Sequence, residues 1–134
     1  MRKTRVLLAD DHPGLLQAVR SLLNTDPDLD VVRCVDNGES LFDAAMKLHP
    51  DVIVTDISMP KLNGIEAVKR LRERGCSAKV VFLTVHIDHD VVRAALEAGA
   101  LGYVLKSAIT TDLLIAIEEA LAGRTFISLE VSAE

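Results

Sequence analysis

Four short, continuous apolar runs dominate the pattern of this chain, and each of them ends at a polar side chain. The runs cover residues 6–9 before Asp10 and Asp11, 52–55 before Asp56, 80–83 before Thr84, and 103–105 before Lys106. Runs of this kind are typical of strands that are buried on both faces, as in a parallel sheet. A more mixed run at residues 31–35 predicts one further strand, which we expect at an edge of the sheet.

Between these runs, apolar residues recur at the spacing of a helix that buries one face. The expected end signals are Pro13 in the first turn of the first helix, Asn37 and Asn63 as caps of the second and third, Gly99 after the fourth, and Thr110 or Thr111 as the cap of the fifth. Strand and helix therefore alternate five times.

This alternation predicts an α/β fold of the flavodoxin-like, doubly wound type. We expect a single five-stranded parallel sheet in the order 2-1-3-4-5, with helices on both faces. In this order the strands at residues 6–9 and 52–55 are neighbours at the centre of the sheet, so Asp10, Asp11 and Asp56 should meet at its carboxyl edge.

Composition narrows the classes of protein that the chain can represent. Its 134 residues suit one domain, and with only 3% aromatic residues the core must be aliphatic. The net charge of −5 argues against nucleic-acid binding by this chain itself. No apolar run is long enough to cross a membrane, and the run after the basic N-terminus is too short for a signal peptide, so we expect a cytoplasmic protein without membrane contact.

The polar residues at the predicted carboxyl edge suit a metal-dependent phosphoryl site. Three clustered carboxylates repel one another, and Mg²⁺ is a hard cation that takes oxygen ligands and relieves this repulsion. With Lys106 added, the charges of the three acids, one Mg²⁺ and one ammonium sum to zero, so a carboxylate could accept a phosphoryl group as a nucleophile. Taken singly, Asp10 and Asp11 could instead cap a helix, Asp56 could be a turn residue, and Lys106 could be solvated.

Five segments together resemble the receiver domain of bacterial two-component response regulators. They are residues 7–12 (LLADDH), 54–60 (VTDISMP), Asn63-Gly64, Leu83-Thr84 and 102–106 (GYVLK). The resemblance spans about residues 4–123. It implies a switch that a sensor histidine kinase activates by phosphorylation and that controls transcription.

The resemblance also implies roles for single residues. Asp56 would be the phosphoacceptor and a Mg²⁺ ligand, together with Asp11 and the backbone carbonyl of Ser58, and Asp10 would act indirectly. Lys106 and Thr84 would bind phosphoryl oxygens.

Seven residues carry further expectations. Tyr103 would swing inward as Thr84 moves; without the resemblance we would expect a half-buried tyrosine with a satisfied hydroxyl. Ser58 and His86 could modulate the lifetime of the phosphoryl group, although simple exposure is the favoured interpretation of His86. His12, His49 and His89 lack the spacing of metal ligands. Ser107 follows Lys106 where many relatives carry proline, so we assume no cis bond there.

The resemblance further suggests a domain division and partners. Residues 1–123 would form the receiver, and residues 124–134 would be a tail or the start of a linker to an absent helix-turn-helix output domain of the LuxR/NarL-like type, which would bind DNA. The chain would then be an excised receiver. A homodimer would use either the helix at 88–98 with the strand at 103–105 and the last helix, or the first and last helices.

Two other classes of function compete with the switch. A Mg²⁺-dependent phosphatase or phosphotransferase with an aspartyl nucleophile would resemble the haloacid-dehalogenase-like enzymes, which need a second acid where Ser58 stands and a cap for which this chain has no spare length. A plain interaction module with a vestigial pocket would not need Asp56, Thr84 and Lys106 together. We therefore expect no enzyme beyond self-phosphorylation from a phosphodonor and slow autodephosphorylation.

Overall fold

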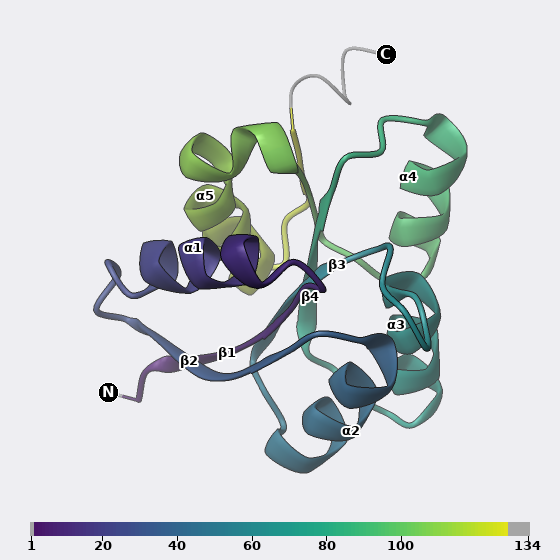
Figure 1. Ribbon diagram of the computed structural model, residues 1–134, viewed down its shortest axis with the longest axis horizontal. Helices are drawn as coiled ribbons and strands as arrows, with labels where there is room; N and C mark the ends of the chain where they lie inside the picture. The colour runs from purple at the N-terminus through teal and green to yellow at the C-terminus, as the bar shows by residue number, and fades with distance from the viewer. Residues whose placement is uncertain (1, 129–134) are drawn as a thin grey trace.

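The computed structural model describes residues 2–128 and has a parallel sheet at its centre (Figure 1). The strands are β1 (Thr4–Ala9), β2 (Leu29–Val35), β3 (Val52–Asp56), β4 (Lys79–Thr84), β5 (Gly102–Leu105) and β6 (Phe126–Ile127). Their order in the sheet is β2-β1-β3-β4-β5-β6, and every neighbouring pair is parallel. The predicted order of the first five strands is confirmed, as is the edge position of β2.

Helices cover both faces of the sheet, as predicted. They are α1 (Pro13–Leu23), α2 (Gly38–Leu48), α3 (Gly64–Glu73), α4 (His89–Glu97) and α5 (Ile109–Leu121), with a short 3₁₀ turn η1 (Lys106–Ala108) before α5. Successive strand residues point to opposite faces, so Leu7 and Ile53 belong to the core layer that includes residues of α2, α3 and α4, whereas Leu8 and Val54 belong to the layer that includes residues of α1 and α5. Both layers are built mainly from aliphatic side chains.

The expectation of only five strands is wrong, because residues after Gly123 return along the sheet as β6. Gly123 has a φ of 80°, in the left-handed region that favours glycine, and the chain turns there. Phe126 and Ile127 then pair with Gly102 and Tyr103 of β5. The two side chains enter opposite core layers. A strand of two residues is too short to show a periodic pattern, so the sequence did not reveal it.

Two of the helix caps predicted from the sequence are present in the structure, and a third is not. The Asn37 and Asn63 side chains accept hydrogen bonds from the backbone N–H groups of Ser40 and Glu66, as predicted for N-caps. The predicted cap of the last helix is wrong, because α5 begins at Ile109 directly after η1. The Thr111 hydroxyl lies 3.1 Å from the carbonyl oxygen of Ala108 and donates back to it.

The predicted boundary at residue 123 stays a prediction, although Phe126–Ile127 belong to the sheet and Ser128 is buried. Residues 129–134 of the predicted tail lie outside the described part of the chain. Within residues 2–128, no helix combines the length and apolarity that a membrane crossing needs.

Candidate phosphoryl and metal site

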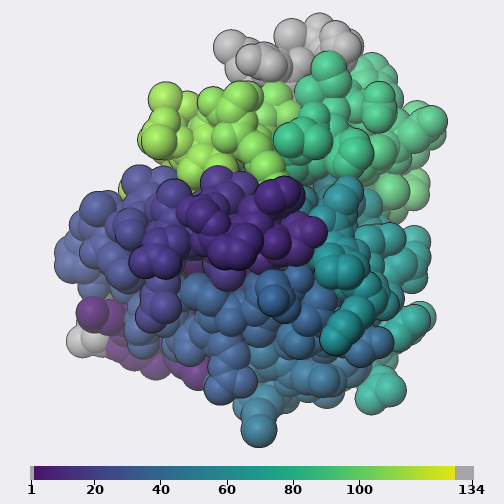
Figure 2. All heavy atoms as spheres, in the orientation of Figure 1, coloured from purple at the N-terminus to yellow at the C-terminus, as the bar shows by residue number. Residues whose placement is uncertain are grey.

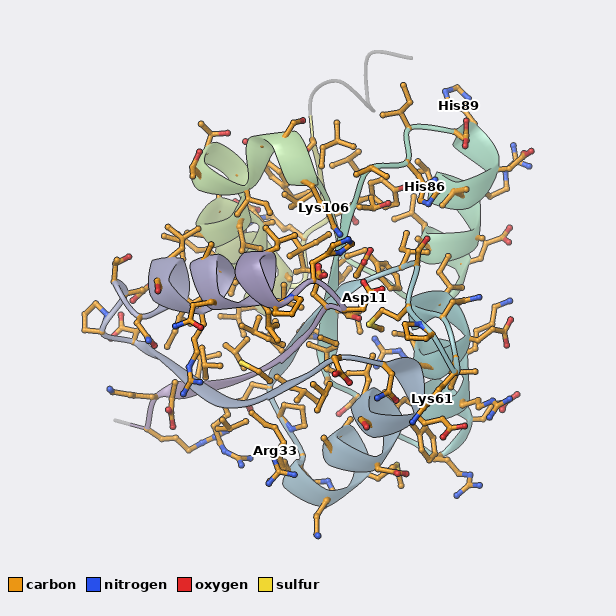
Figure 3. All side chains as sticks on the ribbon, in the orientation of Figure 1. Asp11, Arg33, Lys61, His86, His89 and Lys106 are labelled. Carbon is orange, nitrogen blue, oxygen red and sulfur yellow. The ribbon has the colours of Figure 1, made fainter. Side chains whose placement is uncertain are left out.

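The carboxyl ends of the four central strands bring the predicted site residues to one edge of the sheet. Asp10 follows β1, Asp56 and Thr84 end β3 and β4, and Lys106 follows β5. The three residues Asp10, Asp56 and Thr84 are buried. Figure 3 shows Lys106 and Asp11 near one another at this edge. In Figure 2 the purple segment after β1 adjoins the teal loop after β3, so segments far apart in the sequence form one surface beside the site.

Lys106 links the two buried carboxylates. Its Nζ donates a hydrogen bond to Oδ2 of Asp56 at 3.1 Å and lies 3.3 Å from Oδ2 of Asp10. Only 16% of the Lys106 side chain is exposed, so the alternative of a solvated lysine is wrong. The ammonium therefore partly offsets the repulsion between the two acids.

Asp10 is anchored through one oxygen and leaves the other without a hydrogen bond. Its Oδ1 accepts from the N–H of His12 at 2.9 Å. Its buried Oδ2 has no hydrogen-bond partner, because Lys106 is near enough for an ion pair but not aligned for a hydrogen bond. His12 is the N-cap of α1 and no side chain caps that helix, so the alternative of a helix-capping acidic pair is also wrong.

The donor set fits a hard divalent cation. Ligand atoms of Asp10, Asp11, His12 and Asp56 all lie within 4.8 Å of one another. The Asp11 side chain is 33% exposed, so the cluster opens to solvent on that side. An oxygen-rich cluster with one buried oxygen that lacks a hydrogen bond is suited to a metal ion that takes carboxylate oxygens and water. Sequence reasoning missed His12, whose Nδ1 is 3.3 Å from Oδ1 of both Asp10 and Asp11; its place directly after two acids was the available signal.

Close backbone packing fixes the loop that follows Asp56. The N–H of Ser58 donates to Oδ1 of Asp56 at 3.3 Å, and the N–H of Gly64 donates to the carbonyl of Ile57 at 2.7 Å. A Cβ at Gly64 would lie 2.2 Å from the carbonyl oxygen of Asp56, and one at Gly38 would lie 1.8 Å from that of Leu62. Both positions therefore require glycine, and the two glycines hold the loop against α2 and β3.

Burial and charge act in opposite directions on the two central ionisable groups. Burial raises the pKa of the Asp56 carboxyl, and the hydrogen bond and charge of Lys106 only partly oppose this. Burial alone would lower the pKa of Lys106, but its contacts with Asp56 and Asp10 outweigh burial and raise it. Lys106 therefore stays charged, and ionised Asp56 would gain from a further cation nearby.

Thr84, His86 and Tyr103 form a hydrogen-bonded group beside the acids. The N–H of His86 donates to Oγ1 of Thr84, and the Tyr103 hydroxyl donates to the carbonyl of His86, each at 3.0 Å. Tyr103 is fully buried rather than half-buried, and its hydroxyl is satisfied. Burial raises the pKa of this hydroxyl, and the Thr84 hydroxyl partly offsets that effect.

His86 is half-buried rather than simply exposed. Its Nε2 lies 3.3 Å from Oγ of Ser58, which follows the end of β3. This contact joins the loops after β3 and β4 above Asp56. It was not foreseen from the sequence, because the two residues lie 28 positions apart.

Comparison with known sequences agrees with this geometry. The sequence model of the response regulator receiver domain matches residues 6–118. The nitrate/nitrite response regulator protein NarL of Escherichia coli K12 is 41% identical over 123 residues, which cover 92% of this chain and 57% of NarL. The transcriptional regulatory protein DegU of Brevibacillus brevis is 35% identical over 97% of this chain and 55% of its own length. The chain thus spans a little over half the length of these relatives.

Solved structures show the same fold. A two-component response regulator of the LuxR family from Aurantimonas sp. superposes with a TM-score of 0.93 and 33% identity, over 98% of this chain and 94% of that one. The isolated receiver domain of RcsB from Salmonella enterica serovar Typhimurium, solved with the phosphomimetic BeF₃⁻, gives a TM-score of 0.90 with 30% identity over 98% of both chains. The chain therefore belongs to the response regulator receiver domains, and its relatives are of the NarL/LuxR type.

Proposed function

We propose that this receiver is switched by a phosphoryl group that Asp56 takes from the phosphohistidine of a sensor kinase, with Mg²⁺ bound beside it. The observation that carries the proposal is the position of Lys106, which bridges Asp56 and Asp10 next to a cluster that suits a hard cation. Membership of the receiver family supports the same role. The comparisons lend no support to the alternative of a Mg²⁺-dependent phosphatase.

The transfer itself needs one nucleophilic oxygen. A carboxylate oxygen of Asp56 forms a bond to phosphorus, the bond from phosphorus to the imidazole nitrogen breaks, and its electron pair stays on the imidazole. Asp56, Asp11 and the backbone carbonyl of Ser58 would hold the metal ion, with Asp10 acting through water. Bound Mg²⁺ supplies positive charge that offsets the acids and the incoming phosphoryl oxygens.

Lys106 and Thr84 would then receive the phosphoryl oxygens. Lys106 already touches the carboxylate, and its ammonium has further protons to donate. The Thr84 hydroxyl accepts from His86 in this structure, so its own proton remains available to a phosphoryl oxygen. Tyr103 is already fully buried in this conformation, so its predicted inward swing would not require a move from solvent into the core.

The switch would act by population shift. A phosphoryl group that binds one packing of Thr84 and Lys106 better than another favours that packing. The readout face would include α4, β5 and α5, and a homodimer would use this face or α1 and α5. Regulation of transcription would require a DNA-binding region such as the NarL-type relatives suggest, since the net charge of −5 does not suit direct contact with DNA.

The partner kinase would dock beside the site. Val85 and Ile87 on the loop before α4 are 73% and 43% exposed, which leaves two apolar side chains in solvent near Thr84. We propose that Ser58 and His86, whose side chains meet above Asp56, set the lifetime of the phosphoryl group by controlling the access of water. Slow self-dephosphorylation would be the only hydrolytic activity.

Incubation with acetyl phosphate and Mg²⁺ tests the proposal. Intact-mass analysis should show the gain of one phosphoryl group, which is lost in Asp56→Asn and absent when EDTA removes the metal. Asp51→Asn is the matched control, because Asp51 lies at the opposite end of β3 from Asp56. Multiple turnovers of a phosphate ester would favour an enzyme instead, and phosphorylation of Asp56→Asn at the wild-type rate would refute the assignment.

A further inference from the structure

The end of the described chain binds along β5, the strand that carries two residues of the site. Phe126, Ile127 and Ser128 form this contact, which we call the C-terminal clasp. The N–H of Phe126 donates to the carbonyl of Leu101 at 2.8 Å, and the N–H of Ser128 donates to that of Tyr103 at 2.9 Å. The clasp therefore supplies hydrogen-bond partners for the outer edge of β5. As a result, β6 and not β5 forms the edge of the sheet in the predicted readout face of α4, β5 and α5.

Ser128 makes a second connection, through its side chain. Its Oγ accepts from the N–H of Leu105 at 3.0 Å and donates to Oδ2 of Asp112 on α5 at 2.9 Å. Ser128 is 1% exposed, and its bond to Leu105 is buried whereas its bond to Asp112 is partly buried. Leu105 directly precedes Lys106, and the hydroxyl thus fixes the last residue of β5 against α5.

A chain of hydrogen bonds joins the clasp to the phosphoryl site. Thr84 Oγ1 accepts from the N–H of His86, the carbonyl of His86 accepts from the Tyr103 hydroxyl, and the carbonyl of Tyr103 accepts from the N–H of Ser128. Together with the Leu105 contact, this connects both Thr84 and Lys106 to Ser128.

We propose that the clasp holds β5 in the arrangement described above, and that phosphorylation of Asp56 weakens the contact of Ser128 with Leu105 and Asp112. The proposal rests on the proposed function. Lys106 Nζ lies 3.1 Å from Oδ2 of Asp56 and 3.3 Å from Oδ2 of Asp10, so the new anionic oxygens of a phosphoryl group on Asp56 would draw the ammonium away from this position. Movement of Lys106 pulls on Leu105, whose N–H is held by Ser128. Ser128 and Asp112 are thus positioning residues for Lys106.

Because the coupling between the two sites is reciprocal, the proposal can also be tested by breaking the clasp and measuring ligand binding at Asp56. If the phosphorylated arrangement weakens the clasp, then a broken clasp must favour that arrangement by the same factor. Ser128→Ala and Asp112→Ala should therefore bind beryllium fluoride, in the presence of Mg²⁺, about fivefold more tightly than the wild-type chain. Tyr103 is the one tyrosine of a chain without tryptophan, so its fluorescence reports this binding at the site.

Three further variants separate positioning from loss of stability. Asp112→Asn keeps an oxygen that can accept from Ser128 and should bind beryllium fluoride like the wild type. The double variant Ser128→Ala with Asp112→Ala should bind no more tightly than either single variant, because both break one connection. Thr25→Ala removes an exposed hydroxyl bond to the carbonyl of Leu22, far from the site, and should leave the affinity unchanged.

Hydrogen exchange in the wild-type chain gives an independent readout. Beryllium fluoride with Mg²⁺ should speed exchange at the amides of Phe126, Ser128 and Leu105. Unchanged or weaker affinity of the two alanine variants, or slower exchange at these amides, would overturn the clasp proposal while the proposed function stands. A wild-type chain that binds no beryllium fluoride would overturn both.

Discussion

Gly64 approaches the backbone of Asp56 so closely that no side chain fits between them. A Cβ at Gly64 would lie 2.2 Å from the carbonyl oxygen of Asp56, and the Gly64 N–H bonds to the next carbonyl, that of Ile57. The first residue of α3 thus fixes the backbone of Asp56, the proposed phosphoacceptor. The position of this side chain depends on a residue that has no functional group of its own.

Gly64→Ala should therefore destabilise the fold, by about 2–4 kcal/mol, because backbone and not a flexible side chain must give way. Urea unfolding measures the loss. Gly14→Ala is the matched control, since nothing lies within 4 Å of a Cβ at this position in the first turn of α1. It should be neutral or more stable by up to about 1 kcal/mol, as expected for glycine to alanine in a helix. Equal effects of the two substitutions would contradict the packing argument.

Lys106→Met should affect the metal and the phosphoryl mimic in opposite ways. Loss of the ammonium removes a positive charge beside Asp10 and Asp56, so Mg²⁺ alone should bind about threefold more tightly. Beryllium fluoride loses its cationic donor and should bind at least about tenfold more weakly. Titrations followed by Tyr103 fluorescence, with and without fluoride, measure both. A decrease in both affinities would indicate a general loss of structure.

Asp11→Asn should weaken Mg²⁺ binding by about tenfold or more, because one negatively charged ligand becomes a neutral one. The fold should be little affected, since the Asp11 side chain is 33% exposed. Calorimetric titration with Mg²⁺ measures the affinity, and thermal unfolding without metal checks stability. Asp28→Asn is the control, because Asp28 directly precedes β2 and its carbonyl accepts from Thr4, at the end of β1 opposite to the acids. Wild-type affinity in Asp11→Asn would remove this residue from the ligand set.

Asp56 and Asp51 should contribute to stability with opposite dependence on pH. Burial places the folded pKa of Asp56 above its ordinary value of 3.8, so its contribution is greatest below pH 3.8 and is lost as the pH rises through the folded value. The Arg2 hydrogen bond, helped by the N–H of Arg5, holds the pKa of Asp51 below 3.8 against a smaller effect of burial. Ionised Asp51 therefore stabilises the fold above pH 3.8, and this contribution is lost as the pH falls.

At pH 7 without metal, Asp56→Asn should raise the melting temperature by about 2–5 °C, whereas Asp51→Asn should lower it slightly. The Asp56→Asn difference should shrink as the pH falls through the raised pKa of Asp56 toward 3.8, whereas the Asp51→Asn difference should shrink as the pH falls below 3.8. Saturating Mg²⁺ should reduce the advantage of Asp56→Asn, because the cation stabilises the ionised carboxylate of the wild type. Scanning calorimetry of the three proteins across this range measures each effect. A lower melting temperature for Asp56→Asn at pH 7 would contradict the assigned cost of burying its charge.

The features that the sequence predicted well are those set by local chemistry. Short apolar runs end at the acids and the lysine, and parallel strands bring those ends together, so the residues of the site could be predicted to meet before its geometry was known. The caps at Asn37 and Asn63 depend only on the next few residues. The features that it missed depend on distant partners: β6 pairs with β5 through two residues, and Ser58 meets His86 across two loops. Tyr103 is fully buried because α4, β6 and the loop at His86 surround it together.

The wholly parallel sheet also has a consequence for synthesis on the ribosome. The two central acids emerge early, and Asp56 leaves the exit tunnel long before Lys106, which lies 50 residues further along the chain. β4 and β5, and with them half of the site, cannot join before their own crossover helices are made. Until Lys106 has been made, Asp10 and Asp56 therefore lack the internal cation that contacts both of them in the folded chain.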